Sequence, residues 1–123
     1  MYEVLLFKGA REKSLIKDYI LELKVKANSS KSARITLNKI YEYIGLLEKM
    51  GTRAGEPYIK HIEGNIWELR PASDRMFFFS WINKKIVLLH YFHKKSQKTP
   101  KREIEQAHRN LVKFLEEEQW EKV

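Results

Sequence analysis

The 123-residue chain has no cysteine and only three prolines and five glycines. Without cysteine there can be no disulfide, no thiolate nucleophile and no cysteine-ligated metal. No window approaches the ~18 consecutive apolar residues of a membrane span, and the apolar run near the N-terminus is too short for a signal peptide. With 43% hydrophobic and 33% charged residues, we expect one cytoplasmic globular domain over residues 1–123.

Acidic residues are missing from one long stretch of the chain. Residues 75–102 carry eight of the 24 lysines and arginines and no aspartate or glutamate, so the net charge of +8 arises entirely in this segment. Concentrated positive charge is typical of a surface that binds phosphates or an acidic partner. A solvated face on a basic protein would have the same composition.

The first half of the sequence has the pattern of a strand followed by a helical hairpin. A short strand is predicted over 2–7, and apolar residues at helical spacing predict helices over 11–26 and 31–50. Serines in the turn between the helices can cap the second one, and Gly51 stands where a left-handed C-terminal cap belongs. The apolar stripe predicted for the second helix consists of Ala33, Leu37, Ile40, Tyr41, Ile44 and Leu47.

The second half changes to the period of strands. Four β-branched and aromatic runs separated by short turns predict an antiparallel meander of three or four strands. The nearly continuous apolar runs in 75–82 and 85–92 favour central strands covered on both faces. A last helix is predicted from Thr99–Pro100, with Thr99 as its cap. Its predicted apolar side is Ile104, Ala107, Leu111 and Leu115. The fold class is therefore α+β, with helices packed on a curved antiparallel sheet.

The acidic tail after this helix has no predicted element. Trp120 in the tail is expected either to dock on the domain or to serve a partner.

Cations stand at the predicted strand ends. If residues 71–74 form a hairpin loop, Arg70 and Arg75 lie close across two strands, where like charges repel each other. An anionic ligand between them would convert that repulsion into binding. Alternatively, Glu68 or Asp74 pairs with one arginine, in a surface ion pair that contributes about 0–1 kcal/mol.

Cations also surround the start of the last helix, where the helix dipole favours acids. Lys98 precedes this helix, and Lys101 and Arg102 lie in its first turn. Free helix amides together with lysine side chains make a phosphate site, although helix ends also tolerate unfavourable charges.

The four histidines show no i, i+4 metal-binding pair, so no metal site is expected. Strand alternation places His90 on one face and Tyr91 with His93 on the other. His90 lies within an apolar run and is expected to be a core histidine. His93 precedes two lysines, which favour its neutral form and make it a candidate for acid–base chemistry. Tyr58 and the strand aromatics are able to stack on bases, but aromatic residues in strands are more often core.

The motifs of residues 66–109 resemble those of a known toxin group. They are Leu69-Arg70 before the hairpin, Arg75 opening the next strand, Phe92-x-Lys94-Lys95 ending the last strand, and Gln97–Pro100 before a helix with Ala107 and Arg109. This pattern resembles the RelE/ParE superfamily of type II toxins, in its phage-derived, HigB-like branch. The spacing of Ala107 and Arg109 is one residue shorter than in that branch, and the N-terminal elements follow the same order.

The resemblance implies a RelE-like fold and cleavage of messenger RNA, commonly in the ribosomal A site, without metal or cofactor. It also implies a helix-turn-helix antitoxin (HigA-like) as partner. Some members of the superfamily poison DNA gyrase instead, so the fold does not decide the chemistry. The alternative is therefore a non-enzymatic, ParE-like gyrase poison or a nucleic-acid-binding module that uses the same basic face.

Metal-free RNA cleavage requires a base at the 2′-hydroxyl, cations at the phosphate and an acid at the leaving oxygen. For the phosphate we predict Arg70, Arg75 and Lys95. For proton transfer we predict His93, with Glu56 or Lys60 as the opposite partner. The predicted RNA-binding residues are Lys60, Lys94, Lys98, Lys101 and Arg102. Ribosome-dependent relatives often carry lysines where this chain has Ile66 and Glu68, so the identity of the base stays open.

Overall fold

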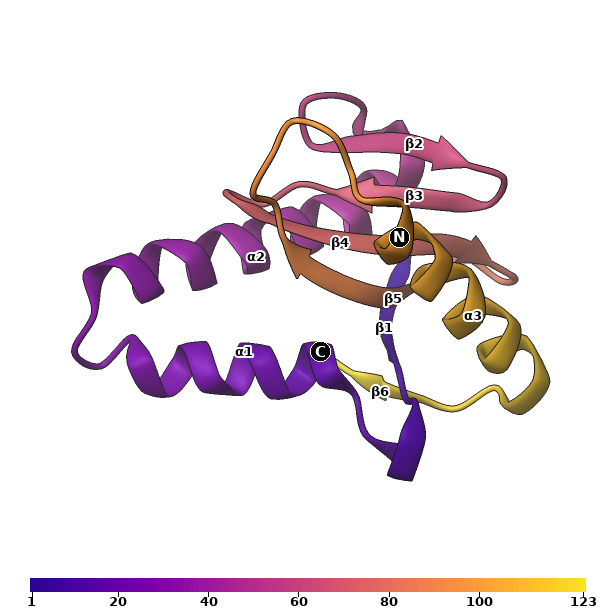
Figure 1. Cartoon of the computed structure of the whole chain (residues 1–123), viewed down its shortest axis with the longest axis horizontal. Helices are drawn as coiled ribbons and strands as arrows, with labels where there is room; N and C mark the ends of the chain where they lie inside the picture. The colour runs from indigo at the N-terminus through magenta and orange to yellow at the C-terminus, as the bar shows by residue number, and fades with distance from the viewer.

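The computed structural model describes all 123 residues and confirms the α+β class. Three α-helices and a six-stranded sheet form the domain (Figure 1). In chain order the elements are β1 (Glu3–Phe7), α1 (Leu15–Lys26), α2 (Lys31–Met50), β2 (Ile59–Glu63), β3 (Ile66–Leu69), β4 (Asp74–Trp81), β5 (Lys85–His93), α3 (Lys101–Glu117) and β6 (Trp120–Lys122). Short 3-10 turns, η1 (Ala10–Glu12) and η2 (Gly51–Ala54), precede α1 and follow α2.

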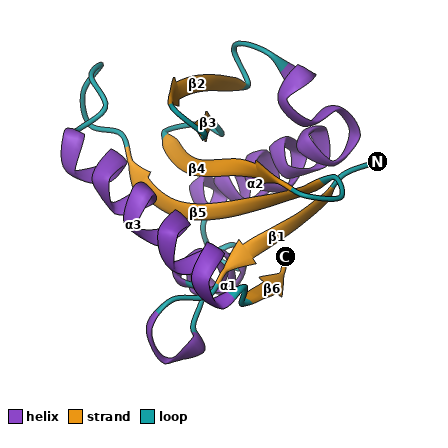
Figure 2. Ribbon diagram, turned by 90° about the vertical axis from the view of Figure 1, so that its right-hand side faces the viewer, coloured by secondary structure: helices purple, strands orange, loops and turns teal.

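The strands lie in the order β2-β3-β4-β5-β1-β6. The predicted antiparallel meander corresponds to β2 through β5. Strand β1 joins it in parallel beside β5, with Glu3 opposite Lys85, and β6 pairs antiparallel with the outer side of β1. Helices α1 and α2 cover one face of the sheet and α3 covers the other (Figure 2).

Each helix begins directly after a serine or a proline, which occupies its N-cap position. Ser14 accepts a 3.1 Å bond from the N–H of Lys17, so α1 begins at Leu15 and not at the predicted residue 11. Ser30 accepts a 3.2 Å bond from the N–H of Ala33 and caps α2, as predicted. The predicted cap at Thr99 is wrong, because Pro100 occupies the N-cap of α3 without any side-chain bond.

Gly51 ends α2 at the predicted position with a positive φ of 57°, but its ψ of −140° lies outside the left-handed helical conformation that was expected. The turn also needs a glycine for space, since a Cβ at this position would lie 2.7 Å from the ring of Tyr2.

Two hydrophobic cores lie on the two faces of the sheet. Phe78 belongs to the core under α1 and α2, whereas Phe77 and Phe79 belong to the core under α3. The long apolar runs of β4 and β5 therefore serve both cores, which confirms that these strands are central and covered on both sides.

Two predicted core positions are wrong. Tyr41 is 38% exposed and lies off the buried stripe of α2. In α3, Leu115 is 51% exposed, and Phe114 is the buried residue instead. A step from Leu111 to Phe114 keeps the apolar side in line with the 3.6-residue period, so either position satisfies the sequence pattern.

The C-terminal tail forms β6, which the sequence did not predict. The ring of Trp120 lies 5.7 Å from that of Trp81 and 6.3 Å from that of Phe114, so it docks on the core under α3. None of the helices has the length and apolarity required to cross a lipid bilayer.

Candidate functional site

Arg70 and Arg75 face each other across the β3–β4 turn. Leu69 pairs with Met76 in the ladder, and the two arginines extend that register by one step. Between them lies the carboxylate of Glu68, with Oε1 3.5 Å from Nε of Arg70 and 3.8 Å from Nε of Arg75. The side chain of Glu68 is only 1% exposed. The sequence alternative was an ion pair between Glu68 and one arginine, whereas in the structure Glu68 pairs with both.

The two arginines open into a pocket of about 530 Å³ lined by Arg70, Arg75, Lys94, Lys95, Ser96 and Gln97. We call it the cationic pocket. Its residues come from three separate segments: the end of β3, the start of β4 and the loop after β5. In Figure 1 that loop rises past the same ends of the strands. The N–H of Lys94 donates a 2.9 Å bond to the carbonyl of Ser73, which holds the loop beside the β3–β4 turn.

Burial makes the positive charges of this pocket unfavourable. The pKa of Lys94 is lowered mainly by burial, with Arg75, Arg70 and Lys60 acting in the same direction and Glu68 against them. Burial likewise lowers the pKa of Arg75, opposed by Glu68 and assisted by Arg70. Each like charge in reach raises the cost of keeping these groups protonated. An added anion would reduce that cost.

The guanidinium groups also have unused hydrogen-bonding capacity. The Nε atoms of Arg70 and Arg75 are buried without a hydrogen-bond partner. Nη1 of Arg75 donates to the carbonyls of Ala72, at 2.9 Å, and Asp74, at 2.7 Å, which fixes the guanidinium against the turn. A buried donor without an acceptor costs free energy. Four cations line the pocket and one buried carboxylate pairs with two of them, so the pocket favours an anion rich in oxygen acceptors.

His93 lies on the opposite face of the sheet from the cationic pocket. It pairs with Asp74 across β4 and β5, and its Nδ1 lies 2.5 Å from Oδ1 of that carboxylate. The other oxygen of Asp74 accepts a 2.6 Å bond from the hydroxyl of Tyr19 on α1. The predicted combination of His93 with Arg70, Arg75 and Lys95 is therefore divided by the sheet, and the nearest charged partner of His93 is an acid, not a lysine.

The predicted partners for proton transfer, Glu56 and Lys60, occupy different places. Glu56 is exposed in the turn before β2 and does not line the pocket. Lys60 lies opposite Glu68 in the β2–β3 ladder and is one of the charges that lower the pKa of Lys94. Lys60 thus belongs to the rim of the cationic pocket.

The cations near α3 do not converge on the pocket. Lys98, Lys101 and Arg102 are exposed and none of them lines it. The first turn of α3 also contains Glu103, whose carboxylate binds His90 at 2.7 Å and Arg102 at 3.5 Å. The expected phosphate site at this helix start is thus already occupied in part by an acid.

His90 is a satisfied, mostly buried histidine, as predicted, with the bond to Glu103 as its polar contact. Lys84 and Lys85, which contribute to the basic segment of the sequence, lie at the start of β5, at the end remote from Lys94 and Lys95. The acid-free segment therefore does not form one continuous surface.

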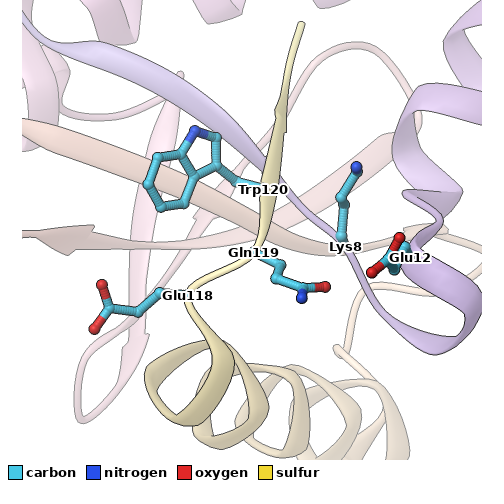
Figure 3. A pocket seen from close by; sticks show the side chains of 5 residues that line it. All are labelled: Lys8, Glu12, Glu118, Gln119 and Trp120. Atoms are coloured by element: carbon cyan, nitrogen blue, oxygen red, sulfur yellow. The ribbon is translucent and has the colours of Figure 1, made fainter.

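Two other cavities offer less to a polyanion. A cavity of about 420 Å³ between the start of α1, β5 and α3 is largely apolar. Two of its polar residues, His90 and Asn110, are already bound to Glu103 and to the carbonyl of Leu89. A shallow pocket lined by Lys8, Glu12, Glu118, Gln119 and Trp120 has side chains that point in different directions (Figure 3).

Sequence reasoning missed how Glu68 and Thr99 support the pocket. The hydroxyl of Thr99 donates a 3.4 Å bond to Oε2 of Glu68, so the loop after β5 is tied to the acid beneath the two arginines. One signal was present in the sequence: Glu68 and Arg70 are two residues apart in a strand and therefore share a face. The partner across the loop could not be read from local sequence.

The fold and the pocket define a small α+β protein of RelE-like architecture with a cationic pocket at one end of its sheet. Residues 30–112 match the family model described as phage derived protein Gp49-like (DUF891). The chain therefore belongs to the Gp49-like family, a toxin-like, phage-derived family within the RelE/HigB-type toxin group. The matched range includes every residue that lines the cationic pocket. No curated protein matches the chain.

Proposed function

We propose that this protein is the toxin of a type II toxin–antitoxin system and cleaves messenger RNA, on the ribosome, without a metal ion. One observation carries the proposal: cationic side chains from three segments converge on a single pocket in a member of a toxin-like family. The pocket has the charge and the spare donors that a strained phosphodiester requires.

In the proposed reaction the 2′-hydroxyl of a nucleotide attacks the adjacent phosphorus, and the 5′-oxygen of the next nucleotide leaves. The products are a 2′,3′-cyclic phosphate and a 5′-hydroxyl. Arg70 and Arg75 bind the non-bridging oxygens, and Lys95 adds a third positive charge. Negative charge grows on these oxygens in the transition state, so preorganised cations lower the barrier without reorganising. Before substrate binds, Glu68 holds the two guanidinium groups in place.

Proton transfer falls to Lys94 in this proposal: its neutral amine removes the proton of the 2′-hydroxyl, and solvent water protonates the leaving 5′-oxygen. Lys94 lines the pocket, and its lowered pKa makes the neutral amine, a base, more accessible than in an exposed lysine. His93 and Glu56 do not line the pocket. The geometry thus supports a different base from the histidine that the sequence suggested.

The proposed partners are messenger RNA, the ribosome and a helix-turn-helix antitoxin. An antitoxin segment that carries acids would be attracted to the cationic pocket and would compete with RNA for the same arginines. An antitoxin bound elsewhere could instead prevent entry into the ribosomal A site.

The test is induction of the protein in cells, followed by mapping of RNA ends. New 5′-hydroxyl ends in translated messages, absent after induction of Arg75→Ala, are the expected result. A purified Arg75→Ala protein with the wild-type circular dichroism spectrum ensures that lost cleavage is not lost folding. Growth arrest with intact messages and a DNA-damage response would contradict the ribonuclease proposal and support a gyrase poison.

A further inference from the structure

A groove lined by three tyrosines lies beside the cationic pocket and is not used by the reaction above. It has a volume of about 380 Å³ and is lined by Tyr41, Glu42, Tyr43, Gly45, Leu46, Lys49 and Tyr58. We call it the tyrosine groove. The ring centroids of Tyr43 and Tyr58 lie 5.4 Å apart and their planes are inclined at 70°, so the two rings contact each other edge to face. Tyr41 and Tyr58 are each 38% exposed.

The tyrosine groove and the cationic pocket share no lining residue, but they meet at neighbouring strand ends. Ile59 pairs with Leu69 in the β2–β3 ladder, and the N–H of Arg70 donates a 3.0 Å bond to the carbonyl of Tyr58, which extends the register. Tyr58, Arg70 and Arg75 therefore stand in one row across the ends of β2, β3 and β4. Tyr43 lies close enough to Arg75 to be among the groups that affect its pKa.

Gly45 gives an independent reason to expect a ligand in this groove. It lies inside α2, where glycine is less stabilising than alanine. No close contact inside the protein requires a glycine at this position, because an added Cβ would meet no atom within 4 Å. The missing side chain leaves open space along the groove, where a flat ligand is able to approach the helix backbone.

The charges around the groove suit a nucleic acid. Lys49 lines it, and Nζ of Lys39 and of Lys24 lie 6.0 and 5.8 Å from the ring centroids of Tyr43 and Tyr41. Aromatic faces beside ammonium groups are the usual means of holding unpaired bases together with their backbone. Glu42, which pairs with Lys39 at 3.6 Å, is the one acid in the lining.

We propose that the tyrosine groove binds one nucleobase of single-stranded RNA, stacked on the exposed side of the Tyr58 ring, while a neighbouring phosphate of the same strand occupies the cationic pocket. This inference rests on the proposed function for its choice of RNA. It adds a base-binding subsite formed by α2 and by Tyr58, which precedes β2. The bound RNA would then run from the loop after β5 toward α2.

The test measures binding of fluorescein-labelled 2′-O-methyl RNA heptamers, which the proposed reaction cannot cleave. A second set of heptamers carries one abasic nucleotide, placed at each position in turn. Tyr58→Leu should weaken binding of the intact heptamer by about tenfold, the loss expected for one stacked base. At one position the abasic heptamer should bind wild-type protein and Tyr58→Leu equally. Tyr58→Phe, which keeps the ring, should bind like wild type.

Gly45→Leu provides a variant that is not expected to damage the fold. Leucine favours the helix more than glycine does, so the melting temperature should stay the same or rise while affinity for the heptamer falls. Wild-type affinity in both Tyr58→Leu and Gly45→Leu would overturn the base subsite even if cleavage is intact, and would leave the groove as a surface for a protein partner. Failure of the wild-type protein to bind any heptamer would overturn this inference, whereas the mapping of RNA ends in cells decides the proposed ribonuclease separately.

Discussion

The hydroxyl of Tyr19 donates a 2.6 Å hydrogen bond to the carboxylate of Asp74, and this bond joins α1 to the first residue of β4. Asp74 is almost fully buried and also binds His93. Its backbone carbonyl accepts a bond from Nη1 of Arg75. The helical hairpin thus supports, from the opposite face of the sheet, the turn that carries an arginine of the cationic pocket.

We expect Tyr19 to make the stability of the protein fall steeply in alkali. Burial and the bond to Asp74 hold the pKa of Tyr19 far above its ordinary value of 10.0. Above pH 10 the unfolded chain releases the phenolic proton and the folded chain does not, so the stabilisation present below that pH is lost by up to about 1.4 kcal/mol per pH unit. Urea unfolding of wild type and Tyr19→Phe from pH 8 to 11.5 measures the difference. Parallel curves for the two proteins would show that Tyr19 ionises as easily folded as unfolded.

Replacement of Glu68 by glutamine should weaken the fold and make it dependent on anions. Loss of one partner from a buried ion pair costs about 3–5 kcal/mol, because the remaining charges are left uncompensated. Inorganic phosphate between Arg70 and Arg75 should replace the missing charge, so it should raise the melting temperature of Glu68→Gln more than that of wild type. Glu63→Gln is the control, since Glu63 pairs with His108 at the surface. An equal response to phosphate in all three proteins would argue against an anion site between the arginines.

Lys94→Arg should separate binding from proton transfer. Arginine keeps the positive charge but stays protonated in proteins, so RNA affinity should be retained while cleavage falls by about 10²–10⁴-fold. In the wild-type protein the cleavage rate should rise with pH up to the lowered pKa of Lys94, and the variant should lose that rise. Lys84→Arg, at the other end of β5, should behave like wild type in single-turnover assays. Full cleavage by Lys94→Arg would assign the base to another group.

His93→Ala tests the division of the site by the sheet. Because His93 binds Asp74 under α1 and does not line the cationic pocket, its loss should reduce stability by about 1–3 kcal/mol, the cost of leaving a buried acceptor with one partner fewer. Affinity for uncleavable RNA should change by less than threefold. Unfolding by urea and fluorescence titration, with Arg75→Ala as the RNA-binding control, give both quantities. If His93→Ala abolished cleavage at unchanged stability, the histidine would regain the catalytic role that the sequence favoured.

The differences between sequence and structure have local causes. Alternation correctly separates His90 from His93, but which of the two shares a face with Arg70 and Arg75 depends on the register of β4 against β5. That register, with its irregularity between Phe77 and Phe78, is set by packing. The composition of residues 75–102 likewise suggested that Lys84 and Lys94 belong to one basic surface, although the length of β5 separates them. The proximity of Arg70 and Arg75 was predictable from the sequence, because a short turn brings its flanking residues together.

Neither the strand in the C-terminal tail nor the tyrosine groove could be predicted from the sequence. β6 is three residues long and stable only beside β1, so no periodic pattern marks it. Tyr43 and Tyr58 meet through the packing of α2 on the sheet, a contact between residues with no local relationship in the chain.

The position of β1 in the sheet has a consequence for how the protein reaches its active form. The strand that ends beside Lys94 and Lys95 is flanked on one side by β4 and on the other by residues from the opposite end of the sequence. Such a pairing forms only after nearly the whole chain has been brought together, and long-range closures of this kind slow folding. A fragment without β1 would expose an unpaired edge of β5, so the strand that leads to Lys94 and Lys95 is completed only when the N-terminal strand is in place.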